Sequence, residues 1–174
     1  MDSKTISIIK NKLSNYLKDK EILDLIVFGS VMKGKAMPRD IDIAFITDKE
    51  ILPDIDGFHV SIVKSSDFFK PISIINTLMR EGYSLRHNKY FCELHGFNSR
   101  VLFKYELTSL DASSKVKVVN NLRGKGKEKG IVEGNSGEWL ANQVFTIPID
   151  QEHIFSQFFI NSKVKFKKFY VLIH

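Results

Sequence analysis

Hydrophobic and polar positions follow recognisable periods along the first third of the chain. Residues 4–19 place apolar side chains at near-helical spacing with lysines between them, which predicts an amphipathic helix. Residues 22–28 form a compact apolar run that stops at Gly29, as a buried strand does. Residues 40–46 alternate polar with apolar side chains over their first four positions, residues 58–63 alternate as well, and each segment predicts a further strand.

The rest of the chain predicts a mixture of helices and strands. Capping side chains precede residues 68–80 and Gly82 follows them, which favours a helix there. Beyond this point the pattern predicts a strand at 100–106, a helix within 107–123, a glycine- and lysine-rich loop at 124–130, short strands near 131–134 and 143–148, a helix near 150–160 and a closing strand at 163–173. The expected fold class is therefore α+β.

Candidate chemistry lies where the first two predicted strands are joined. Phe28-Gly29-Ser30 is followed, after nine residues, by Asp40-Ile41-Asp42. Two carboxylates at i and i+2 on a strand project from the same face, and they repel each other unless a cation lies between them. Carboxylate oxygens are hard ligands that suit Mg²⁺. The sequence thus predicts a divalent-metal site, unless Asp40 only follows a turn and Asp42 faces solvent on an edge strand.

The residues beside the two acids suit a polyphosphate. Gly29 allows close approach of the backbone to a phosphate, and Ser30 with the following amides can donate hydrogen bonds to it. Lys33 and Lys35 can neutralise triphosphate charge. Positioned phosphates, a bound metal and nearby cations are what phosphoryl or nucleotidyl transfer needs.

This Gly-Ser-x9-Asp-x-Asp arrangement resembles the signature of the DNA polymerase β nucleotidyltransferase superfamily, which includes family X polymerases and small minimal nucleotidyltransferases. The resemblance implies a palm domain, with a mixed β-sheet and helices on one side. It implies that Gly29, Ser30 and Lys33 bind the nucleotide and that Asp40 and Asp42 are catalytic metal ligands for Mg²⁺ or Mn²⁺, with an NTP or dNTP as substrate.

The chain departs from this family pattern at the third catalytic carboxylate. The next predicted strand directs His59 and Ser61 towards the site, because Phe58, Val60 and Ile62 form its apolar face. We take His59 as the better match to the missing acid, since a neutral imidazole can act as a base or a weak metal ligand. A histidine without a chemical role is the alternative. Glu93 and Glu106 lie on neighbouring segments, but no spacing argument selects either.

Composition narrows the class of protein. The 174 residues are 43% hydrophobic and 26% charged, as in a globular protein. No apolar run reaches the roughly 20 residues that cross a bilayer, and no signal peptide is evident, so we expect no membrane partner and a cytoplasmic location. A single cysteine, Cys92, excludes an internal disulfide and a cysteine-cluster zinc site.

Positive charge gathers in the carboxy-terminal part. The net charge is +6, with a pI of about 9.3, which suits a polyanionic partner. We expect nucleic-acid contacts from a first basic cluster that includes Lys115, Lys117, Arg123, Lys125 and Lys127. In a second basic cluster, at 163–168, Phe166, Phe169 and Tyr170 interleave with or follow the lysines. Two interpretations of these aromatic residues are open: they stack on nucleic-acid bases, or they point inward from a strand into the core.

Residues 113–168 bear a weak similarity to the thumb of small family X polymerases. This similarity suggests a palm domain at 1–108 and a small α/β thumb-like subdomain at 109–174. The leading hypothesis is a nucleotidyltransferase that transfers a nucleoside monophosphate to a hydroxyl acceptor, with nucleic acid favoured. The alternatives are a catalytically impaired module that binds nucleotide or nucleic acid, and an antitoxin-like subunit with a protein partner.

Overall fold

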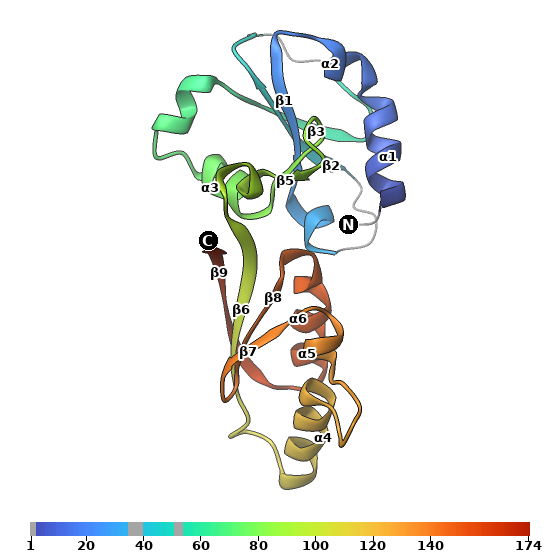
Figure 1. Ribbon diagram of the computed structural model, residues 1–174, viewed down its shortest axis with the longest axis vertical. Coiled ribbons are helices and arrows are strands. Elements are labelled where there is room, and N and C mark those ends of the chain that lie inside the picture. Colours follow the sequence, from blue (N-terminus) through green and yellow to red (C-terminus); the bar gives the residue numbers. More distant parts are fainter. Residues whose placement is uncertain (1–2, 35–39, 51–53) are drawn as a thin grey trace. The chain divides into compact units, whose positions relative to one another are not determined.

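The computed structural model describes residues 3–34, 40–50 and 54–174, and it divides the chain into two compact units (Figure 1). The N-terminal unit comprises Met1–Ser99 together with Leu172–His174, and the C-terminal unit comprises Arg100–Val171. The sequence suggested a division after residue 108. The structure divides the chain earlier because the strand that begins at Asn98 pairs with a strand of the C-terminal unit.

The N-terminal unit is a five-stranded mixed sheet with helices, in the strand order β3-β2-β1-β4-β5. Strand β2 is parallel to β3 and antiparallel to β1, and β4 is antiparallel to both β1 and β5. Short 3₁₀ helices are labelled η. The elements of this unit are α1 (Ser3–Lys12), α2 (Ser14–Lys18), β1 (Ile22–Phe28), η1 (Gly29–Lys33), β2 (Ile41–Thr47), β3 (Phe58–Val63), η2 (Ser65–Phe69), α3 (Ser73–Glu81), β4 (Tyr83–Ser84), β5 (Lys89–Tyr90) and η3 (Phe91–His95).

Helices cover both faces of this sheet, whereas the family resemblance led us to expect them on one side. Leu25 and Val27 of β1 pack with Ile9 of α1 in one buried cluster. Ile26 of the same strand packs with Leu78 of α3 in another. The reason is visible in β1 itself: residues 25–28 are all apolar, so neighbouring side chains on opposite faces both need to be buried.

The C-terminal unit is a four-stranded sheet in the order β7-β8-β6-β9, packed against helices. Its core is aromatic: the Phe103 ring stacks on Phe145 at a centroid distance of 5.6 Å and also contacts Phe155 and Phe159 of α6. The elements are β6 (Asn98–Glu106), α4 (Ala112–Arg123), α5 (Ile131–Gly134), β7 (Glu138–Ala141), β8 (Val144–Pro148), η4 (Ile149–Gln151), α6 (Glu152–Asn161) and β9 (Lys165–Ile173).

Three local expectations are corrected. The helix expected over residues 4–19 is divided at Leu13, and the one expected over 68–80 is divided into η2 and α3. Residues 131–134, expected as a strand, form a helical turn closed by the Gly134 amide donating to the Gly130 carbonyl. Within the described part of the chain, no helix is long and apolar enough to cross a membrane.

Candidate active site

The glycine-serine bend and Asp42 lie against each other, because β1 and β2 are hydrogen-bonded neighbours. Phe28, the last residue of β1, is paired in register with Asp42 of β2. The next residue, Gly29, turns the chain into η1 with a φ of +80°. A Cβ atom on Gly29 would lie 2.2 Å from the Asp42 Oδ2 atom. Only glycine therefore combines this backbone conformation with such close approach to the carboxylate.

His59 faces the same side of the sheet as Asp42. Strands β2 and β3 pair in parallel with Asp42 opposite His59, and the His59 Nδ1 atom lies 3.1 Å from the Asp42 Oδ1 atom. The exposed fractions of the two side chains are 71% and 34%, so solvent reaches both. The structure thus brings together the carboxylate and the histidine that we matched to the third family acid. Ser61 lies two residues further along β3 and is half-buried.

Asp40 and Lys33 lie near the two ends of the segment that connects β1 to β2. Asp40 is exposed and lies in a bend immediately before β2, while Ser30 and Lys33 lie in η1. The left-handed residue Gly34 ends η1, and its amide donates to the Ser30 carbonyl. Lys35, expected to add positive charge, lies outside the described residues.

The largest feature that the sequence did not reveal is a buried carboxylate. Glu81, at the end of α3, is only 2% exposed, and its Oε2 atom lies 2.9 Å from the Lys33 Nζ atom. The Arg80 guanidinium also contacts it, at 3.1 Å. A buried carboxylate needs such partners, because an uncompensated charge in the interior is strongly destabilising. The Lys33 ammonium group is consequently held at a defined place beside η1.

Helical spacing was the signal that could have identified Glu81. Ile74, Leu78 and Glu81 occur at i, i+4 and i+7, which places the acid on the apolar stripe of α3. An acid on a buried stripe requires a cation from a neighbouring element. Of the two acids that the sequence offered on neighbouring segments, Glu93 accepts a hydrogen bond from the Tyr90 amide and caps η3, and Glu106 lies on β6.

The candidate metal site offers few protein ligands. Among the residues that the structure describes, no group of three or more His, Cys, Asp or Glu side chains is arranged to hold a metal ion. Mg²⁺ commonly binds to proteins through one or two carboxylates, and substrate phosphates and water complete its coordination. Asp42, one-third exposed beside the Gly29 bend, has the chemistry and the access for this kind of binding.

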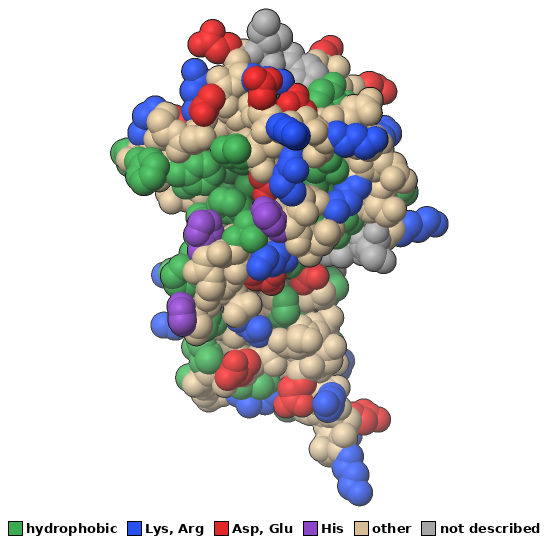
Figure 2. Space-filling model, turned by 45° about the horizontal axis from the view of Figure 1, so that its top comes forward, with side chains coloured by type: hydrophobic (Ala, Val, Ile, Leu, Met, Phe, Trp, Pro, Cys, Tyr) green, Lys and Arg blue, Asp and Glu red, His purple; other side chains and the backbone are tan. Residues whose placement is uncertain are grey.

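The first basic cluster lies on and after α4. Lys115 and Lys117 are on α4, and Lys125 and Lys127 are exposed in the following loop. Arg123 is not simply solvated: its guanidinium carbon lies 3.9 Å from the centre of the Trp139 ring. Basic and acidic side chains are intermixed on the visible surface (Figure 2), so the net charge of +6 forms no single block there.

Part of the chain matches a known protein family. The family described as polymerase beta, nucleotidyltransferase matches residues 11–90, a range that contains the Gly29 bend, Asp40, Asp42, His59 and Glu81. Neither the curated proteins nor the solved structures contain a significant match. This match supports the assignment of residues 11–90 to the polymerase β-like nucleotidyltransferase superfamily.

Proposed function

We propose that this protein is a metal-dependent nucleotidyltransferase that transfers a nucleoside monophosphate from an NTP or dNTP to a hydroxyl group, with nucleic acid as the acceptor. In this reaction the acceptor oxygen forms a bond to the α-phosphorus, the bond from that phosphorus to the bridging oxygen breaks, and pyrophosphate leaves. The observation that carries the proposal is the contact of the Gly29 bend with the Asp42 carboxylate, which puts the backbone that would bind phosphates next to a metal-binding group.

Asp40 and Asp42 would hold the divalent ion. Both are described acids at the start of β2, and both have access to solvent. A bound Mg²⁺ or Mn²⁺ supplies positive charge to the triphosphate and to the charge that develops during transfer. Replacing either aspartate would leave a single carboxylate, and one carboxylate binds a strongly hydrated ion such as Mg²⁺ poorly.

Gly29, Ser30 and Lys33 would bind the phosphates. Gly29 turns the backbone close beside Asp42, and Ser30 offers a hydroxyl group in the next position. Lys33 reaches this region already paired with Glu81, which limits its rotamers before the nucleotide arrives. Pre-organised charge contributes more to binding than a mobile side chain, because less conformational entropy is lost.

His59 is the described group best placed to take the proton of the attacking hydroxyl. If its Nδ1–H donates to the Asp42 Oδ1 atom, the Nε2 atom carries the lone pair that accepts a proton. This arrangement uses Asp42 twice, as a metal ligand and as the group that orients the imidazole.

One observation favours a second candidate function, a nucleotide-binding module without turnover. The position that matches the third family acid carries His59, and this side chain binds one oxygen of Asp42. A site with two acids can bind a metal–nucleotide complex without activating the acceptor hydroxyl.

Incorporation of labelled nucleotide separates the two functions. The purified protein is incubated with labelled NTPs or dNTPs, Mg²⁺ or Mn²⁺, and oligonucleotide acceptors. We expect metal-dependent transfer that Asp42→Asn abolishes, while Asp54→Asn, a change at an exposed acid before β3, leaves it intact. Nucleotide binding without transfer under all these conditions would favour the binding module.

A further inference from the structure

The sheet of the C-terminal unit has one covered face and one open face. Along β6, Val101, Phe103 and Tyr105 are at most 1% exposed and face the aromatic core. Of the alternate residues, Leu102 is half-buried, whereas Lys104 and Glu106 are exposed. Because successive strand residues point to opposite faces, Lys104 and Glu106 lie on the open face.

Lysines and aromatic residues are interspersed along the edge strand β9, and each lies on one of these two faces. Phe166 turns inward, with its ring stacked on Phe159 at 5.1 Å. Tyr170 also turns towards the helices, where its hydroxyl donates to Glu152 Oε2 at 2.9 Å, and Lys168 is ion-paired with the same carboxylate. Residues 165, 167 and 169 therefore point to the open face.

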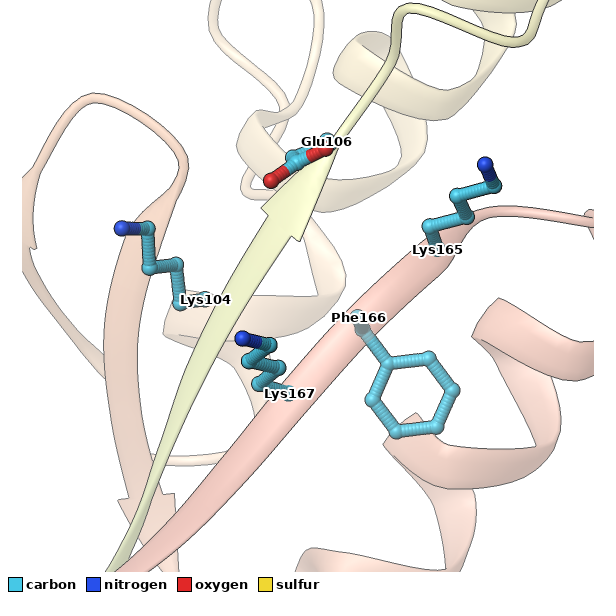
Figure 3. A pocket seen from close by; sticks show the side chains of 5 residues that line it. All are labelled: Lys104, Glu106, Lys165, Phe166 and Lys167. Atoms are coloured by element: carbon cyan, nitrogen blue, oxygen red, sulfur yellow. The ribbon is translucent and has the colours of Figure 1, made fainter.

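Three lysines on this open face surround one shallow pocket. Its volume is about 180 Å³, and its lining is Lys104, Glu106, Lys165, Phe166 and Lys167. In Figure 3, Lys104 and Lys167 extend to the same side of β6 and β9, while the Phe166 ring points away from them. Among the described residues, the three lysines take part in no ion pair, in contrast to Lys168.

An exposed aromatic ring continues the same row. Phe169 follows Lys165 and Lys167 at the two-residue spacing of one strand face, it is 50% exposed, and no described ring contacts it. Lysines at this spacing are about 7 Å apart, which suits successive phosphates of an extended strand. The neighbouring Phe169 ring offers a surface on which an unpaired base can stack.

We propose that the open face formed by Lys104, Lys165, Lys167 and Phe169 binds single-stranded nucleic acid. The lysines contact consecutive phosphates and Phe169 stacks on a base, a contact that duplex DNA cannot make because its bases already stack on each other. This surface differs from the first basic cluster of α4 and the following loop. The inference rests on the proposed function in so far as it names the acceptor, but binding is measured without metal or NTP.

The test is fluorescence anisotropy of a labelled oligothymidine in EDTA, at several salt concentrations. We expect the logarithm of the binding constant to fall with the logarithm of salt with a slope of about −2, and Lys104→Gln or Lys167→Gln to reduce the slope by about 0.7 each. Phe169→Ala should weaken binding about tenfold. Glu106→Gln should strengthen it, because a carboxylate next to the phosphate path is removed.

Matched control variants distinguish binding by this surface from a general effect of the protein's positive charge. Lys18→Gln and Lys20→Gln each remove an exposed lysine of the N-terminal unit, and neither should change the affinity by more than twofold. Circular dichroism confirms that each variant is folded. Loss of affinity confined to the open-face variants supports the proposal.

The proposal is overturned if the wild type does not bind the oligothymidine, if it binds duplex equally well, or if Lys20→Gln weakens binding as much as Lys167→Gln. The proposed transferase survives these outcomes, because nucleotide transfer to another hydroxyl acceptor is assayed separately. Conversely, binding of single-stranded nucleic acid without nucleotide transfer would refute the proposed transferase activity and support the proposed binding surface.

Discussion

Replacing Gly29 by alanine perturbs the candidate site at its closest contact. The added Cβ atom would lie 2.2 Å from Asp42 Oδ2, where ordinary contacts require more than 3.0 Å. The carboxylate would have to move by roughly 1 Å, and a displacement of that size at a reacting centre costs on the order of 100-fold in rate. The positive φ adds about 1–2 kcal/mol of backbone strain.

Gly57→Ala is the matched control, because Gly57 has the same φ of +80° and its added Cβ would meet only the end of the Lys12 side chain, at 4.0 Å. Both variants should lose a similar amount of unfolding free energy from strain. We expect only Gly29→Ala to lose about 100-fold in nucleotide transfer, measured with labelled nucleotide under identical metal concentrations. Equal activity of the two variants would refute the reasoning that the Gly29–Asp42 contact organises the site.

Three further predictions concern stability and reactivity. Phe103→Ala removes the centre of the aromatic core and should lower the free energy of unfolding by about 3–5 kcal/mol in denaturant titrations, whereas a loss below 1 kcal/mol would contradict the packing. Burial raises the pKa of the Cys92 thiol and leaves it 1% exposed, so alkylation followed by mass spectrometry should be slow in the native protein and fast in urea; rapid native labelling would contradict this. The Ser114 hydroxyl and amide donate to Asp111 and lower the pKa of that carboxyl group. Its stabilising contribution is therefore present above its unfolded pKa and is lost as the pH falls through the lowered value. The gap between the melting temperatures of the wild type and Asp111→Ala should accordingly narrow on acidification, and a constant gap would refute the assignment.

The first strands and the motif between them were predictable from the sequence. The apolar run at 22–28 and the alternation at 40–46 and 58–63 reflect burial and strand period, and all three segments are strands with boundaries shifted by at most one residue. The orientation of His59 followed from the same alternation, and its contact with Asp42 agrees with it.

Long-range pairing was not predictable, because local patterns do not say which elements meet. The ion pair of Glu81 with Lys33 joins α3 to η1, and nothing near either residue in the sequence indicates the other. The segment 131–134 has β-branched residues that favour a strand, but burial of Val132 and the backbone bond from Gly134 to Gly130 stabilise a helical turn. The sequence likewise did not predict which face of β9 is open to solvent, because this depends on which side of the sheet the helices cover.

Binding of a non-hydrolysable NTP analogue, measured by calorimetry with Mg²⁺ and again with EDTA, tests the central assignment most directly. Nucleotide binding by the wild type should require Mg²⁺, and Asp42→Asn should weaken it at least tenfold while the fold, monitored by circular dichroism, is retained. Equally tight binding by Asp42→Asn in the presence of Mg²⁺ would contradict a metal–nucleotide site beside the Gly29 bend.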